Sequence, residues 1–415
     1  MVRGAGRKDF NVPVIVVEEL CRYLTRINAA SDAASTLRRG EVDCEAFSCR
    51  LRLVIVVVGG SDMSTSNAEF VPTKILFVGA GAIGASVAAW VAANNDGVYV
   101  YDIGEVLAVI KSNGITTYQT DAPDTTCKTV HVQAIDRPGD LPDVDVVVLA
   151  VKNYSLSAVA RQVREQLGDR PVIVSMANGT DNQTILPKLF SKVIYCVVCY
   201  NAKRDSPGIV SYTRKGPLLL GTPDNTLPSE LRRVQALLAS GCLTETVSDL
   251  QDAVHTKIVI NLTNALDALV GRGSVPLSNS DVYQRLLANT LWEGAKIIRA
   301  AGYREHRIAG MPSFNMLHLV TFLPLWMFRS AFERANKAII MTSMTQDVVL
   351  HGARDTELES LTGYMIRLAE KVSVAAPYNH TIYRLGRERF HSGYQAMRCE
   401  EVQAEVDRAI EANKH

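Results

Sequence analysis

The stretch 74-KILFVGAGAIGASVAAWVAANNDGVYVYD-102 contains the clearest indication of the fold. The apolar run from Ile75 to Val78 predicts a buried parallel strand, because it offers no polar face to water. The alanine-rich segment from Ile83 to Ala93 predicts a helix, and the run that ends at Asp102 predicts a second strand. Three glycines occupy the turn between the first strand and the helix: Gly79, Gly81 and Gly84.

The spacing of these glycines indicates a dinucleotide site. We expect Gly79 to let the chain turn sharply, Gly81 to leave room for a pyrophosphate at the helix N-terminus, and Gly84 to let helix and strand pack closely. Ile83, in the same turn, is a further expected cofactor contact. Asp102 lies about 20 residues beyond the glycines, where such a unit carries the acid that binds the adenosine ribose hydroxyls. A glycine turn in an ordinary α/β protein is the alternative, but the strand, helix and acid together favour the dinucleotide.

The composition limits the partners and the cellular location. A chain of 415 residues suggests two or three domains, and its net charge of +1 gives no electrostatic reason to expect a nucleic-acid partner. The eight cysteines lack the spacing of a disulfide framework, which favours a reducing, cytoplasmic compartment. Cys196 and Cys199 have CxxC spacing but lie in an apolar run that reads as a strand, so we expect buried thiols and no metal site.

Two further segments need an interpretation. Residues 1–62 mix basic and acidic side chains evenly, and Met63 opens a stretch that runs directly into the first strand, so we expect a non-catalytic appendage. A small extension that packs on the body is the alternative. Residues 316–328 (MLHLVTFLPLWMF) are too short for a membrane span and contain His318 and Pro324. We expect core, with a subunit interface or a pocket wall formed by Phe322, Trp326 and Phe328 as the alternatives.

Polar residues follow two more predicted strands. The segment DVDVVVLAVKNYSL carries Lys152 and Asn153 after its apolar run, and RPVIVSMANGTDN carries Asn178 and Gly179. Because ligands bind beyond the carboxyl ends of strands in such sheets, we expect Lys152 and Asn178 to face a cofactor. Loop residues that simply face solvent are the alternative.

The pattern becomes helical beyond about Leu250. DAVHTKIVINLTNALDALVG carries Lys257, Asn261 and Asn264 on one flank of an otherwise apolar predicted helix, which indicates a polar pocket. Further along, SMTQDVVLHGARDTELESLTGYM carries four polar side chains that, taken alone, predict a solvated helix face: Ser343, Asp347, Arg354 and Glu357.

Five blocks together resemble the ketopantoate reductase (2-dehydropantoate 2-reductase) family, over roughly residues 74–389. They are ILFVGAGAIG, LAVKNYSL, MANGTDN, KIVINLTNALDAL and SMTQDVVLHGARDTE, in that order. The resemblance implies an α/β Rossmann dinucleotide-binding domain (73–247), then an all-helical C-terminal domain like that of 6-phosphogluconate dehydrogenase (248–395), with 396–415 as a helical tail. It also implies NAD(P)H as the cofactor, and the reduction of a 2-oxo acid, ketopantoate, to the (R)-2-hydroxy acid pantoate.

The resemblance also implies roles for individual residues. Gly79, Gly81 and Gly84 match the phosphate-binding glycines, and Lys152 and Asn178 match residues near the nicotinamide. Lys257 matches the general acid. Glu357 matches an acid that hydrogen-bonds the substrate hydroxyl, and we expect it also to hold the Lys257 ammonium and keep it charged. Two substrate-binding residues match as well, the amide of Asn261 and the hydroxyl of Ser343.

Three positions depart from the family pattern. His255 replaces an aromatic residue, which predicts altered packing or pocket polarity. Ala265 replaces a second substrate-side asparagine, with Asn264 one position away as the expected substitute. Asp102 lies near a strand end where NADPH-using members carry a basic residue. Most members of the family use NADPH, but the carboxylate of Asp102 leads us to expect that this protein favours NADH.

Two other functions stay open from the sequence. One is an NAD-dependent D-2-hydroxyacid dehydrogenase of the mandelate type on the same scaffold, and the other is a non-catalytic dinucleotide sensor. Lys257 together with Glu357 favours an enzyme over a sensor. The expected partner is a small 2-oxo acid, with a homodimer as the expected assembly and no membrane contact.

Overall fold

The computed structural model describes residues 73–308, 312–324, 327, 341–350, 352, 355–390 and 394–412. The expected appendage, residues 1–62, lies outside the described residues, as do Trp326, Phe328 and Arg354. Among the described residues, no helix is both long and apolar enough to cross a bilayer.

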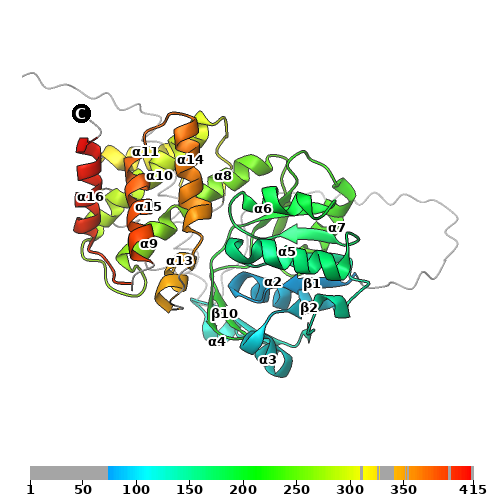
Figure 1. The fold of residues 1–415 in the computed structure, drawn as a ribbon. Helices are drawn as coiled ribbons and strands as arrows, with labels where there is room; N and C mark the ends of the chain where they lie inside the picture. Colours follow the sequence, from blue (N-terminus) through cyan, green and yellow to red (C-terminus); the bar gives the residue numbers. More distant parts are fainter. Residues whose placement is uncertain are drawn as a thin grey trace, which may run out of the picture. The chain divides into compact units, whose positions relative to one another are not determined.

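The first domain is built on an eight-stranded sheet (Figure 1). The strand order is β12-β11-β8-β7-β6-β1-β2-β5, and neighbouring strands are parallel except for the antiparallel pair β8 and β11. The strands are β1 (Ile75–Val78), β2 (Val98–Tyr101), β5 (Gln133–Ala134), β6 (Val146–Leu149), β7 (Val172–Ser175), β8 (Val193–Val198), β11 (Leu218–Gly221) and β12 (Thr244–Thr246). The predicted first strand is therefore confirmed residue for residue, and it lies in the interior of the sheet, between β2 and β6.

Helices cover both faces of this sheet, because its central strands are apolar on both sides. In β1, Ile75 and Phe77 belong to the core that contains α2, whereas Leu76 and Val78 belong to the core that contains α5. The helices of this domain are α2 (Ala82–Ala92), α3 (Gly104–Asn113), α4 (Pro123–Thr126), α5 (Asn153–Leu167), α6 (Asp181–Ile185) and α7 (Pro228–Ala239), with 3₁₀ turns η1 (Pro138–Asp140) and η2 (Leu186–Lys188).

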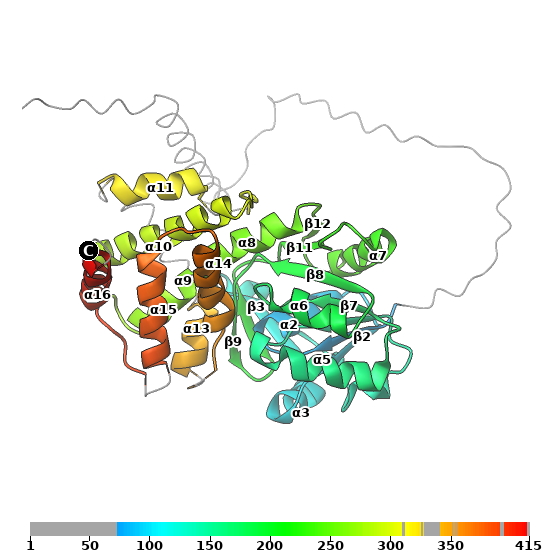
Figure 2. The same ribbon diagram turned by 45° about the horizontal axis from the view of Figure 1, so that its top comes forward.

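A second, four-stranded sheet packs on α2 (Figure 2). Its order is β4-β3-β10-β9, with β3 parallel to β10 and both outer pairs antiparallel. The strands are β3 (Ile115–Gln119), β4 (Lys128–Val130), β9 (Ala202–Ser206) and β10 (Ile209–Tyr212). This sheet brings residues just beyond position 200 next to the helix that follows the glycine turn.

The second domain is helical, as the sequence predicted, and α8 connects it to the sheet (Figure 1). Its helices are α8 (Leu250–Asn261), α9 (Thr263–Val270), α10 (Ser280–Ala300), α11 (Phe314–Phe322), α13 (Ser343–Thr345), the π-helical turns η4 (Gln346–Leu350) and η5 (Glu359–Gly363), α14 (Tyr364–Lys371), α15 (Pro377–Arg389) and α16 (Cys399–Ala412). The single helix expected around Lys257 is divided into α8 and α9 at Leu262.

The core interpretation of residues 316–328 is wrong for Phe322. This residue is 58% exposed, whereas Leu319 on the same helix, α11, is buried. His318 stacks on Trp292 of α10 and is in edge contact with Phe322. Only one flank of α11 therefore contributes to the core.

Candidate active site

The glycine turn is shaped for close packing and for an open helix end. Gly79 has a φ of +97°, and a Cβ on Gly84 would lie 1.9 Å from the carbonyl oxygen of Gly79. A Cβ on Gly81 would meet nothing within 4 Å. Gly81 is also the N-cap residue of α2. Because glycine has no side chain, the first backbone amides of the helix have no capping side chain to accept their hydrogen bonds. The turn thus combines tight packing with an open helix N-terminus of the kind that binds anions.

Asp102 is tied to this turn by its backbone contacts. One carboxylate oxygen accepts a hydrogen bond from the amide of Ala80 at 2.5 Å, and the other accepts one from the amide of Ile103 at 2.7 Å. These two bonds fix the carboxylate at the end of β2, directly beside the glycines.

A cavity of about 580 Å³ joins the turn to the helical domain. Its lining includes eleven of the twelve predicted site residues: Gly79, Gly81, Ile83, Asp102, Lys152, Asn178, Lys257, Asn261, Asn264, Ser343 and Glu357. Gly84, the twelfth, packs against Gly79 behind the turn. Residues from both domains, far apart in the sequence, therefore share one cavity.

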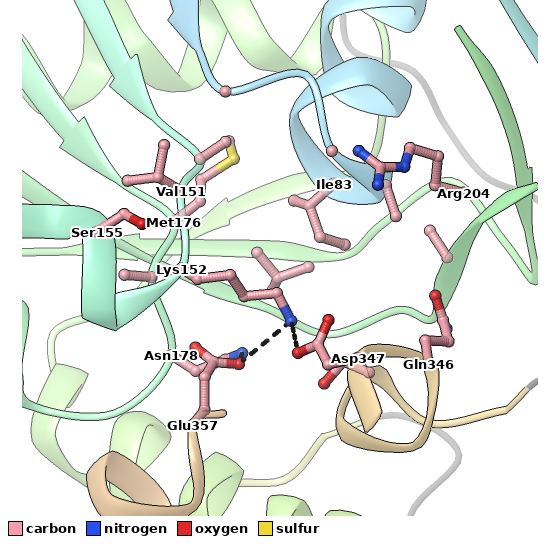
Figure 3. Close-up of a pocket in the computed structure, with 18 of the residues that line it drawn as sticks. Ile83, Val151, Lys152, Ser155, Met176, Asn178, Arg204, Gln346, Asp347 and Glu357 are labelled. Carbon is pink, nitrogen blue, oxygen red and sulfur yellow. Dashed lines mark hydrogen bonds and ion pairs between the residues drawn. The ribbon is translucent and has the colours of Figure 1, made fainter. Parts of the chain in front are cut away.

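Lys152 lies between two carboxylates of the helical domain (Figure 3). Its Nζ is 2.8 Å from Oδ2 of Asp347 and 3.8 Å from Oε2 of Glu357. Burial alone would lower the pKa of Lys152, but the charges of Glu357 and Asp347 outweigh it and raise the pKa above its ordinary value. Lys152 is therefore a cation at neutral pH that links the two domains across the cavity.

Glu357 is the centre of a polar network. Its side chain is only 4% exposed and accepts hydrogen bonds of 3.3 Å from the amides of Asn153 and Asn178. Asn178 in turn accepts a bond of 3.4 Å from the amide of Asn261 on α8. The interpretation of Glu357 and Asp347 as a solvated helix face is wrong, because Glu357 is buried, the Asp347 side chain is only 13% exposed, and both pair with Lys152 of the first domain.

Lys257 stands apart from this network. The expected pairing of Glu357 with Lys257 is not formed: among the described residues Glu357 pairs with Lys152, and no carboxylate pairs with Lys257. Burial lowers the pKa of Lys257, the positive charge of Arg214 lowers it further, and the nearby Cys199 opposes them. Sequence patterns cannot tell which of two lysines a distant carboxylate will meet.

The departure at His255 affects packing and not the cavity. Its Nδ1 lies 2.7 Å from the carbonyl oxygen of Gln251 and its Nε2 lies 2.7 Å from the hydroxyl of Tyr364. Since a carbonyl can only accept, Nδ1 carries the proton and Nε2 accepts from Tyr364. The ring also stacks on Tyr303 at 3.5 Å between centroids.

Cys196 and Cys199 are buried free thiols, as predicted.

Among the polar residues of the site that sequence reasoning missed are Asn153, Asp347 and Arg204. Asn153 follows Lys152 directly, and its position at the start of α5 was the signal that could have found it. Asp347 lines the cavity four residues after Ser343, and Arg204 enters from β9 of the second sheet. Nothing local to Arg204 indicates its place, since that depends on how the second sheet packs on α2.

An open helix N-terminus, a carboxylate at the end of β2 and a desolvated lysine in the same cavity define the class: a dinucleotide-dependent α/β oxidoreductase. Two family models match, "Ketopantoate reductase PanE/ApbA" over residues 75–225 and its "C terminal" counterpart over residues 249–389. The chain belongs to the ketopantoate reductase family.

Individual relatives agree with this membership. A 2-dehydropantoate 2-reductase of Halobacterium salinarum is 25% identical over 324 residues, which cover 76% of this chain and 98% of the relative. Two solved structures share the fold. A 2-dehydropantoate 2-reductase from Geobacter metallireducens has a TM-score of 0.62 and 21% identity, covering 76% of this chain and 99% of the other. A D-mandelate dehydrogenase solved with NADH and anilino(oxo)acetate has a TM-score of 0.60 and 18% identity, covering 81% and 100%.

Proposed function

We propose that this oxidoreductase reduces a 2-oxo acid, ketopantoate, to the (R)-2-hydroxy acid pantoate with NAD(P)H, and that Lys257 is the proton donor. The observation that carries the proposal is the single cavity that contains the open N-terminus of α2, the Asp102 carboxylate and the Lys257 ammonium. A sensor would need the first two of these features but not the third.

The first domain supplies the cofactor contacts. The free amides at the start of α2 and the space beside Gly81 suit a pyrophosphate, and the fixed Asp102 carboxylate suits the hydroxyls of a ribose. Lys152 and Asn178, at the ends of neighbouring strands, suit the nicotinamide end. When bound, the reduced nicotinamide supplies a hydride to the keto carbon of the substrate.

The second domain supplies the proton and orients the substrate. Lys257 stabilises the negative charge that develops on the keto oxygen and donates its proton there, then regains a proton from solvent. Asn261 and Asn264 donate hydrogen bonds that position the 2-oxo acid, and the hydroxyl of Ser343 meets its carboxylate. Glu357 accepts a hydrogen bond from the substrate hydroxyl, because its 3.3 Å contacts leave lone pairs available.

This role for Lys257 predicts the pH dependence of the enzyme. A general acid must be protonated to act, so kcat/KM falls as pH rises through the pKa of Lys257. Because burial lowers that pKa, we expect the alkaline limb to lie below the ordinary lysine value of 10.5. A profile of kcat/KM from about pH 6 to 11 checks this. An activity that stays level beyond pH 10.5 would contradict it.

The position of Asp102 predicts a preference for NADH. Its carboxylate would repel the extra phosphate of NADPH in a partly desolvated site. The first basic residue after it, Lys111, forms an ion pair with Asp136 at 2.6 Å and does not line the cavity. We therefore expect kcat/KM to be higher with NADH, on the order of tenfold.

Replacing Asp102 by Ala together with Ile103 by Arg should shift the preference toward NADPH, since it removes the repulsion and adds a cation at the exposed rim. Initial rates with both cofactors, measured side by side, check both expectations. A clear wild-type preference for NADPH would overturn the role of Asp102 and leave the reductase proposal intact.

The substrate is tested with a panel of 2-oxo acids. We expect ketopantoate to give the highest kcat/KM among ketopantoate, branched aliphatic 2-oxo acids and benzoylformate. A preference for benzoylformate would replace the proposal with the mandelate-type dehydrogenase. Binding of NADH without turnover of any member would replace it with the non-catalytic sensor.

We also expect the protein to be located in the cytoplasm and to assemble as a homodimer. The five cysteines among the described residues are free thiols, as is usual in a reducing compartment.

A further inference from the structure

Arg204 is a cation of the cavity that the proposed reaction does not use. Six charged side chains line the cavity: Arg204, Lys152, Lys257, Asp102, Asp347 and Glu357. Lys152 pairs with the carboxylates of Asp347 and Glu357. Arg204 forms no ion pair with any described residue, so its charge is available to a ligand.

The strand that carries Arg204 aims it at the start of α2. Side chains alternate between the two faces of a strand, and Ala202 and Arg204 of β9 line the cavity while Lys203 does not. Lys203 instead pairs with Asp205 at 2.9 Å. β9 packs against α2, and Arg204 lines the same cavity as Ile83 in the first turn of that helix. Figure 3 shows the guanidinium of Arg204 extending toward this turn.

An anion is the ligand that suits this position. The first amides of α2 lack a capping side chain, and Gly81 places no side chain of its own in front of them. A guanidinium beside open helix amides binds phosphate oxygens through charge-assisted, bidentate hydrogen bonds. The Asp102 carboxylate, proposed for the ribose, lies on the β2 side of the glycine turn, where it accepts hydrogen bonds from the amides of Ala80 and Ile103, whereas α2 begins at Ala82.

We propose that Arg204 binds the pyrophosphate of the cofactor from the second sheet, opposite the N-terminus of α2. This inference rests on the proposed dinucleotide site. It predicts that Arg204 strengthens the binding of every ligand with that pyrophosphate, irrespective of the phosphate that distinguishes NADPH from NADH.

The test measures dissociation constants of ADP-ribose, NADH and NADPH by calorimetry for the full chain and for Arg204→Gln. We expect all three ligands to lose affinity by a similar factor, about tenfold or more, because each loses the same charge-assisted contact. Arg204→Lys should recover part of the loss, since it keeps the charge without the planar fork.

Lys203→Gln is the matched control, because it removes the same charge one residue away on the opposite face of β9. Unchanged affinities in Arg204→Gln, or an equal loss in Lys203→Gln, would overturn the assignment. A loss confined to NADPH would overturn it too, because Arg204 would then contact the extra phosphate. Wild-type protein that binds none of the three ligands would instead refute the dinucleotide site itself.

Discussion

Lys257→Ala should lower kcat by at least about 100-fold, the usual contribution of a general acid. The substitution removes both the proton donor and the charge that stabilises the developing oxyanion. The cofactor contacts come from the first domain, so the dissociation constant of NADH should change little. Steady-state rates with ketopantoate, together with calorimetry of NADH binding, check both parts.

Lys257→Arg separates the two functions of the side chain. Arginine keeps the positive charge but cannot give up its proton at accessible pH. We expect it to restore little of the lost turnover. Near-normal kcat in Lys257→Ala would refute the proton-donor role. Full recovery of turnover in Lys257→Arg would show that residue 257 contributes only its positive charge and does not donate the proton.

Glu357→Ala should lower kcat and raise the KM for the 2-oxo acid together, each by roughly tenfold or more. It removes the acceptor for the substrate hydroxyl, one of the two carboxylates beside Lys152, and the acceptor that Asn153 and Asn178 share. The loss therefore combines substrate contact with the orientation of neighbouring groups. Steady-state kinetics measure both parameters.

Glu359→Gln is the control for this change. It removes a carboxylate two residues along, where the side chain is 60% exposed and pairs with Arg367. We expect its kinetics to match the wild type. If Glu357→Ala behaves like this control, the buried network around Glu357 does not serve the reaction.

The local part of the fold could be predicted from the sequence. The strand at Ile75–Val78, the turn at Gly79 and the close packing at Gly84 depend on neighbouring residues, so pattern and spacing were enough. The same holds for Asp102, because its contacts to the amides of Ala80 and Ile103 follow from two adjacent strands.

The long-range part of the site could not be predicted in this way. Glu357 was expected in the site through a family resemblance, but the polar pattern around it indicated a solvated face. Its partner is Lys152, which belongs to the other domain, and not Lys257. Arg204 reaches the cavity only because β9 joins a second sheet that packs on α2. Such contacts depend on tertiary packing, which periodicity along the chain does not record.

Hydride transfer from the nicotinamide to the 2-oxo acid is measured most directly with a deuterated cofactor. The protein is mixed with ketopantoate and NADH that carries deuterium at both C4 positions of the nicotinamide, and the product is analysed by mass spectrometry and NMR. We expect pantoate with one deuterium at C2, formed in equal amount to the NAD⁺ produced. Pantoate without deuterium, or bound NADH that never reduces the 2-oxo acid, would contradict it.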